Sequence, residues 1–155
     1  MAVMTELYRT DLALWSAQQA EAIRAAAREG SNAPVDWANV AEEIESLGAS
    51  ERRTLASHIR TVIEHLMKMQ ASPAPDPRRG WRETITRTRV NIEEILEDSP
   101  SLRRELPDIV VRQNRAAKRV VLDGLKEWGE LSTELDSLSY DVDQVLGDWF
   151  PGSGT

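Results

Sequence analysis

Apolar residues recur at every third or fourth position through most of this 155-residue sequence, and this spacing constrains the fold more than any other feature. Such a period is typical of helices with one buried face, and no segment alternates apolar and polar residues for long enough to predict a strand. Five segments carry the spacing, and a shorter one follows near the C-terminus. We therefore predict an all-α fold, a single-domain bundle of four to five helices plus a short C-terminal helix, with residues 1–10 and 152–155 flexible.

Capping residues, glycines and prolines set the expected ends of these helices. Asp11 and Ser50 are suited to be N-caps, and Gly48 is expected to end the helix before Ser50. The prolines within residues 73–77 end the third helix, and Pro107 is expected to kink or break the fifth. The expected helices cover residues 11–29, 36–48, 50–71, 80–98, 99–120 and 141–146.

Each expected helix carries an apolar stripe that predicts which side chains are buried. The cleanest stripe is in the third helix, from Leu55 to Met69. The stripes of the first two helices contain Leu12, Trp15, Ala22, Ile23 and Ala26 in the first and Trp37, Val40, Ala41, Ile44 and Leu47 in the second. Because stripes of this kind usually face a core, we expect all three to be buried.

The formal net charge of −7 disfavours a protein whose main role is to neutralise phosphate groups. The negative charge is concentrated in residues 123–148, where eight acidic residues stand against Lys126 alone. The basic residues of the expected fifth helix are Arg112, Arg115, Lys118 and Arg119. No aromatic residues are interleaved with them, so nucleic acid is not an expected partner.

The acidic segment near the C-terminus also carries apolar residues at helical spacing. They are Tyr140, Val142, Val145, Leu146, Trp149 and Phe150. Burying a large apolar side chain stabilises a fold by roughly 1.5–3 kcal/mol, against about 0–1 kcal/mol for a surface ion pair. We therefore expect this segment to dock on the bundle, with packing rather than charge setting its position.

The sequence contains no cysteine, which excludes disulfides and thiolate metal sites and fits a reducing compartment. No apolar run approaches the roughly 18 residues needed to cross a bilayer, and residues 1–10 contain Glu6 and Arg9. We therefore expect a cytoplasmic protein that has no membrane partner.

Four short motifs, taken in order, resemble a known pattern. They are Asp11-Leu12-Ala13-Leu14-Trp15, Glu42-Glu43-Ile44-Glu45-Ser46-Leu47-Gly48, His65-Leu66-Met67-Lys68-Met69 and Gly80-Trp81-Arg82-Glu83-Thr84-Ile85. Together they resemble the bacterial family known as domain of unknown function 29, and the similarity continues to Pro151. The sequence departs from the family pattern at Met69, where an aromatic residue is common, and at Ser139, where proline is expected. The resemblance implies a helical domain and assigns no activity.

Four side chains are candidates for a functional site: Glu43, His65, Arg82 and Arg89. His58 and His65 are seven residues apart, about 10 Å along a helix, so they cannot chelate one metal ion together. A metal ion would need carboxylates from elsewhere, with Glu43 as the best candidate. Arg82 and Arg89 share one flank of the expected fourth helix, where their guanidinium groups would suit an anion.

These side chains also have structural interpretations, which we favour. His65 is expected to hydrogen bond to a side chain of the second or fourth helix, and the two arginines are expected to pair with glutamates. We expect no cofactor and no metal ion. The sequence therefore predicts a non-catalytic protein-interaction module, with a homodimer as one form of that interaction. The alternative is a metal- or anion-binding bundle with hydrolytic activity that uses Glu43, His65 and Arg82 or Arg89.

Overall fold

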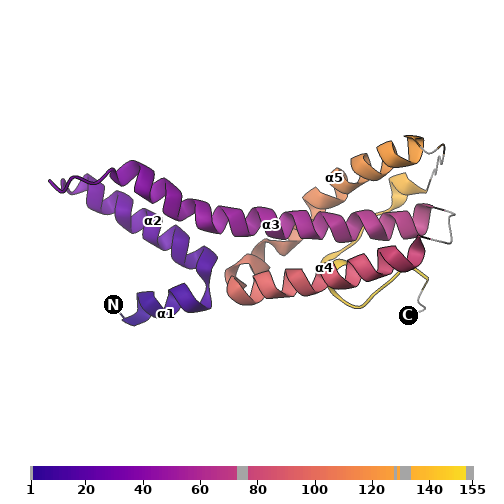
Figure 1. Ribbon diagram of the computed structural model, residues 1–155, viewed down its shortest axis with the longest axis horizontal. Coiled ribbons are helices and arrows are strands. Elements are labelled where there is room, and N and C mark those ends of the chain that lie inside the picture. The colour runs from indigo at the N-terminus through magenta and orange to yellow at the C-terminus, as the bar shows by residue number, and fades with distance from the viewer. Residues whose placement is uncertain (1, 73–76, 128, 130–133, 153–155) are drawn as a thin grey trace. The chain divides into compact units, whose positions relative to one another are not determined.

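The computed structural model describes residues 2–72, 77–127, 129 and 134–152, with side chains from Thr5 onward (Figure 1). The described residues form helices and connecting loops and contain no strand, which confirms the predicted all-α fold. The elements are α1 (Ala2–Thr10), α2 (Leu12–Arg28), α3 (Trp37–Ala71), α4 (Arg78–Asp98), η1 (Pro100–Glu105), α5 (Leu106–Glu127), η2 (Leu135–Ser137) and α6 (Val142–Leu146).

The chain divides into two compact units. The first unit extends to Thr54 and also includes Glu94–Arg103. The second unit consists of Leu55–Glu93 and of the residues after Arg103. The long helix α3 contributes to both, because the division falls within it.

Helix α3 corrects the prediction of two separate helices at 36–48 and 50–71. It is continuous for 35 residues, and both Gly48 and Ser50 lie inside it. Gly48 is needed there because α2 packs against it. A Cβ atom at position 48 would lie in close contact with Ser16 Oγ and 3.2 Å from the carbonyl oxygen of Ala13. This glycine therefore allows two helices to approach each other and does not end a helix.

Other helix ends agree with the sequence more closely. The carboxylate of Asp11 accepts a hydrogen bond from the Leu14 N–H and caps α2, as predicted. The break expected at Pro107 occurs just before it, where the 3₁₀ helix η1 gives way to α5. α5 continues to Glu127, past the predicted end. Residues 2–10, for which the sequence predicted no helix, form α1.

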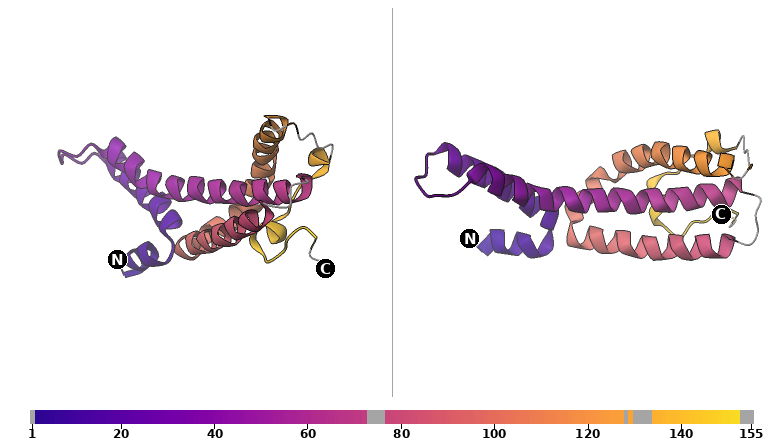
Figure 2. Two further views of the ribbon diagram at one scale, coloured as in Figure 1. Left: turned by 45° about the vertical axis from the view of Figure 1, so that its right-hand side comes forward. Right: turned by 45° about the horizontal axis from the view of Figure 1, so that its top comes forward.

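The second unit has a core of large aliphatic side chains. The predicted stripe of α3 is buried: Leu55, Ile59, Val62, Ile63, Leu66 and Met69. α4 lies beside this part of α3 (Figures 1 and 2) and contributes Ile85 and Ile92. α5 contributes Ile109 and Val121. Each such side chain stabilises the unit by about 1.5–3 kcal/mol relative to exposure in water.

Within the described part of the chain, no helix combines the length and the apolarity that a membrane crossing requires.

Candidate binding surface on the α2–α3 hairpin

In the first unit, α2 and residues 37–54 of α3 form an antiparallel hairpin (Figures 1 and 2). The residues buried along it are small: Ala13, Ser16 and Ala20 of α2, with Ala41 and Gly48 of α3. We call this line of contact the hairpin seam. Its short side chains let the helices approach closely. The buried Ser16 hydroxyl donates a hydrogen bond to the carbonyl oxygen of Ala13.

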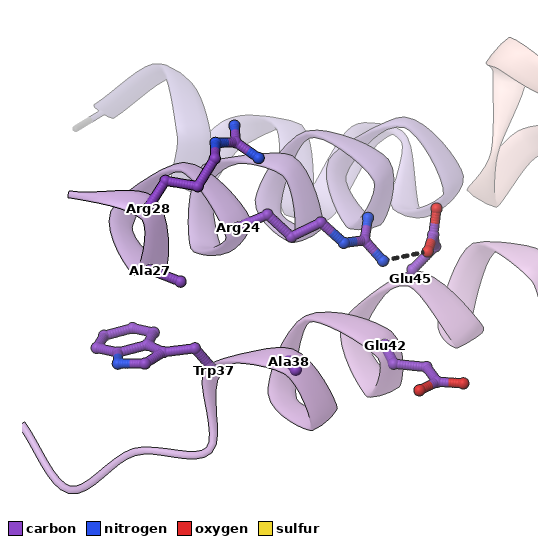
Figure 3. A pocket seen from close by; sticks show the side chains of 7 residues that line it. All are labelled: Arg24, Ala27, Arg28, Trp37, Ala38, Glu42 and Glu45. Atoms are coloured by element: carbon purple, nitrogen blue, oxygen red, sulfur yellow. Dashed lines mark hydrogen bonds and ion pairs between the residues drawn. The ribbon is translucent and has the colours of Figure 1, made fainter. Parts of the chain in front are cut away.

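One side of the hairpin is polar. Arg24 and Glu45 each follow a seam alanine by four residues. On this side, a guanidinium nitrogen of Arg24 lies 2.6 Å from a carboxylate oxygen of Glu45 (Figure 3). This ion pair raises the pKa of Arg24 and lowers the pKa of Glu45. Both groups are open to solvent, so the ion pair contributes little to the stability of the hairpin. It does show that the two side chains lie on the same side of the hairpin.

A pocket of about 450 Å³ opens on this polar side. It is lined by Arg24, Ala27, Arg28, Trp37, Ala38, Glu42 and Glu45 (Figure 3). A guanidinium nitrogen of Arg28 lies 3.0 Å from a carboxylate oxygen of Glu21, so Arg24 and Arg28 each already have a carboxylate partner. The indole N–H of Trp37 is buried and has no hydrogen-bond partner among the described residues. The pocket therefore offers exposed ion pairs rather than an arrangement suited to acid–base chemistry.

The opposite side of the hairpin is apolar. Leu12 and Leu47 come directly before the seam residues Ala13 and Gly48 in the sequence. On either helix, moving one residue towards the N-terminus turns the side-chain direction by about 100° around the helix axis. Moving four residues towards the C-terminus turns it by about 40° in the opposite sense. Arg24 and Glu45 each come four residues after a seam residue and lie on one side of the antiparallel hairpin. Leu12 and Leu47 each come one residue before a seam residue, so they lie on the opposite side.

Six large side chains make up this side, which we call the hairpin face: Leu12, Trp15 and Ile23 of α2, with Val40, Ile44 and Leu47 of α3. None is fully buried, and Val40 and Leu47 are 40% and 41% exposed. In Thr5–Thr54 the only buried hydrophobic side chains are Ala13, Ala20 and Ala41. Of the first two predicted stripes, only Ala41 is buried. The prediction was wrong for the large side chains, because small residues close the seam and the large residues lie beside it.

A buried carboxylate fixes the base of the hairpin within the first unit. Asp11 is 7% exposed, and beyond its capping bond it accepts hydrogen bonds from the N–H and the hydroxyl of Ser101 at 2.7 and 2.8 Å. The hydroxyl oxygen of Ser99 accepts a hydrogen bond from the Ala13 N–H. The sequence indicated Asp11 as a cap but gave no sign of its bonds to residues about 90 positions later.

The sequence-predicted candidates Glu43 and His65 are separated within α3. Glu43 is exposed in the first unit, and His65 is half-buried in the second, 22 residues later. That separation corresponds to about 33 Å along the helix, so Glu43 and His65 of the same α3 cannot bind one ligand together. His65 Nδ1 donates to the carbonyl oxygen of Thr61 at 2.8 Å, so the predicted side-chain partner was wrong. Burial lowers the pKa of His65 and favours the neutral ring.

Arg89, in the second unit, holds the C-terminal segment. Its guanidinium donates to the carbonyl oxygens of Gln144, Val145 and Trp149 at 2.8–2.9 Å, which are acceptors at and beyond the end of α6. Burial lowers the pKa of Arg89. Arg82 and Arg89 also lie over the ring of Phe150, at 3.9 and 4.8 Å from its centroid. Both arginines thus contact the chain's own C-terminal segment.

The predicted docking of this segment is confirmed. Tyr140, Val145 and Phe150 are buried, and α6 begins with a capping box between Asp141 and Gln144. Two polar residues that the sequence did not single out secure Tyr140. Asn114 accepts from its N–H and donates to its carbonyl oxygen, and Gln70 accepts a hydrogen bond from its hydroxyl. On the basic helix, Lys118 donates to the carbonyl oxygen of Asp136.

Comparison with known proteins identifies a family and a similar structure. The model of the family described as "Domain of unknown function DUF29" matches residues 7–150. The fold is similar to the crystal structure of an alpha-helical protein of unknown function from Rhodospirillum rubrum, with a TM-score of 0.72 and 27% sequence identity over 92% of this chain and 90% of that chain. A search of curated proteins found no match.

Proposed function

This chain belongs to the family described as domain of unknown function DUF29, and from that premise we propose that it is a non-catalytic protein-interaction module whose binding surface is the hairpin face. Neither the family description nor the description of the similar Rhodospirillum rubrum protein assigns an activity, so the proposal depends on the geometry of this chain. We also propose the cytoplasm as its compartment, because the sequence is free of cysteine.

The exposure of Val40 and Leu47 is the observation that carries this proposal. Single exposed apolar residues are common on protein surfaces, but a contiguous row of large ones is typical of an interaction site. Val40, Ile44 and Leu47 follow the spacing that places residues on one face of a helix. The partner that fits is a protein that presents an apolar helical face of its own, because two further helices would complete a bundle.

The positions of the catalytic candidates also favour an interaction role. Glu43 and His65 are too far apart along α3 to act on one group, and the donors of Arg89 serve the C-terminal segment. A general acid or base must lie within hydrogen-bond reach of the group it serves. This arrangement gives no support to the alternative of a hydrolytic site that combines these residues.

Site-specific photo-crosslinking in the native cell tests the proposal. A photoreactive amino acid would replace Leu47 on the hairpin face or, as the matched control, Val120, which is 50% exposed on α5 in the second unit. We expect a discrete covalent adduct from position 47 that is absent from position 120. The absence of an adduct at 47, or the same products from both positions, would contradict the proposed surface.

A further inference from the structure

We infer that α5 carries a second docking surface, which binds an acidic segment of a partner protein. This surface lies in the second unit, whereas the hairpin face belongs to the first, so the inference goes beyond the proposed function. It consists of three arginines on the exposed side of α5 and an apolar groove beside them. The spacing of the arginines, their lack of partners among the described residues and the exposure of Val111 support it.

The three arginines form one row along α5, which we call the arginine row. Arg112, Arg115 and Arg119 follow one another after three and four residues, so they lie within about 60° of each other around the helix axis. All three are exposed, and the row extends about 10 Å along the axis. The buried residues Val110 and Val121 lie on the opposite side of α5.

Within the described part of the chain, no guanidinium group of the arginine row forms an ion pair or a hydrogen bond. Arginines on the surface of other helices do find partners: Arg24, Arg28 and Arg87 each contact a carboxylate. Residues 109–122 contain four basic residues and no acidic one, so negative charge does not interrupt the row. The row is therefore a patch of uncompensated positive charge on a chain whose net charge is −7.

The chain's own acidic segment does not neutralise the row where that segment is described. Lys118, beside the row, donates to the backbone carbonyl oxygen of Asp136 and not to its carboxylate. Further along, Tyr140, Val145 and Phe150 are buried, which holds the segment in its docked position. We therefore assign the matching negative charge to another molecule.

An apolar groove opens beside the arginine row. Val111 is 53% exposed and lines two adjoining hollows, of about 390 and 320 Å³. The larger hollow lies between α5 and residues 139–144, and the aliphatic part of its lining consists of Pro107, Val110, Val111 and Val142. The smaller is lined by Asp108, Val111 and Arg112, so the groove is continuous with the row. A large apolar side chain in the groove would cover Val111 while carboxylates of the same segment reach the arginines.

The partner that fits is a protein segment rather than a nucleic acid. A phosphate backbone would leave Val111 uncovered, and the exposed carboxylates of Asp141 and Asp143 beside the groove would repel a long polyanion. A helix of about two turns can present carboxylates at the spacing of the row and one apolar side chain to the groove. Charge would then select and orient the partner, and the apolar contact would contribute most of the affinity.

Selection of displayed random peptides on the full-length chain tests this inference. We expect the enriched peptides to combine several carboxylates with a large apolar residue. Fluorescence anisotropy of these peptides, synthesised with a label, then measures their affinity for variants. Arg112→Glu combined with Arg115→Glu should weaken binding by at least about tenfold, because attraction becomes repulsion. The matched control Arg79→Glu, at an exposed arginine of α4 in the second unit, should leave binding unchanged.

A second pair of variants tests the groove. Val111→Ser should weaken binding severalfold, because it removes the exposed methyl groups that the partner covers. Val120→Ser is the control, since Val120 is 50% exposed on the opposite flank of the same helix. Binding should also weaken as ionic strength rises, because salt screens exposed charges. Circular dichroism would confirm that each variant is folded.

Three outcomes would overturn the inference. One is a selection that enriches no acidic peptides, and another is acidic peptides whose binding survives the double arginine variant. The third is a single-stranded DNA oligonucleotide of the same charge that binds more tightly than the peptides and depends on the same arginines, which would identify a nucleic-acid surface. Each of these leaves the hairpin face to be judged by the crosslinking at position 47.

Discussion

The two parts of α3 belong to one continuous helix, yet they bury different kinds of side chain. In the second unit, α3 buries isoleucine, leucine and methionine against α4 and α5. In the first unit, it buries Ala41 and Gly48 against α2 and leaves Val40 and Leu47 substantially exposed. The same helical periodicity is present in both parts. The difference shows that an apolar stripe defines a face of a helix, whereas the number of neighbouring helices decides whether that face is covered.

This difference has a consequence for stability. A core of several helices can exclude water from large side chains, and most helical stability in proteins comes from such packing. A two-helix layer cannot do so, and here its base depends on the polar link from Asp11 to Ser101. The first unit should therefore tolerate changes on its hairpin face that the second unit would not tolerate in its core.

The largest expected effect comes from removing matched leucines in the two parts of α3. Leu66 is fully buried, whereas Leu47 is 41% exposed. Leu66→Ala should lower the free energy of unfolding by about 2–5 kcal/mol, because it removes buried area and leaves a cavity. Leu47→Ala should cost about 1 kcal/mol or less in the monomer. Urea denaturation at low protein concentration measures both, and equal losses would contradict the contrast between the units.

A second, smaller effect concerns the two arginines that contact Phe150. Arg89→Met removes the donor to three carbonyl oxygens and should cost about 2–3 kcal/mol, since hydrogen bonds from charged groups are strong. Arg82→Met is the matched control, because its described contact is with the Phe150 ring alone and is worth roughly 0.5–1 kcal/mol. Thermal unfolding of both variants checks the order. A larger loss from Arg82→Met would show that ring stacking, not the carbonyl bonds, holds the segment.

The sequence predicted the fold class and most helix ends because those signals are local. Asp11 and Asp141 each cap a helix that begins at the next residue, so both act within one helical turn of themselves. Gly48 was misinterpreted because a glycine inside a helix and one after a helix look alike in sequence. Only the approach of α2 from more than 30 residues away shows which of the two it is.

The candidate site was less predictable for a related reason. Val40 and Leu47 have the spacing of buried residues, and nothing in the sequence shows that alanines take the seam instead. The roles of Asn114 and Gln70 depend on Tyr140, which is 26 and 70 residues away from them. Polar contacts over such separations leave no periodic signal. Arg82 and Arg89 were predicted to pair with glutamates, but Arg89 donates to backbone carbonyls and Arg82 lies over the Phe150 ring. Neither kind of contact has a sequence signature.

The smallest expected effect tests the seam itself through two glycines inside helices. Gly124 of α5 has open space where a Cβ would be, so Gly124→Ala should stabilise the protein by up to about 1 kcal/mol through helix propensity.

At Gly48 the same methyl group would press on Ser16 Oγ and approach the backbone of Ala13 at 3.2–3.3 Å. Overpacking of this kind costs about 1–3 kcal/mol, so Gly48→Ala should be neutral or destabilising in spite of the propensity gain. Adding Ser16→Ala removes the nearest atom and should recover part of the loss. Urea denaturation of the two single variants and the double variant measures this coupling. If Gly48→Ala were as stabilising as Gly124→Ala, the helices would be farther apart than the seam requires, and the large side chains of the hairpin face would have room to turn inward.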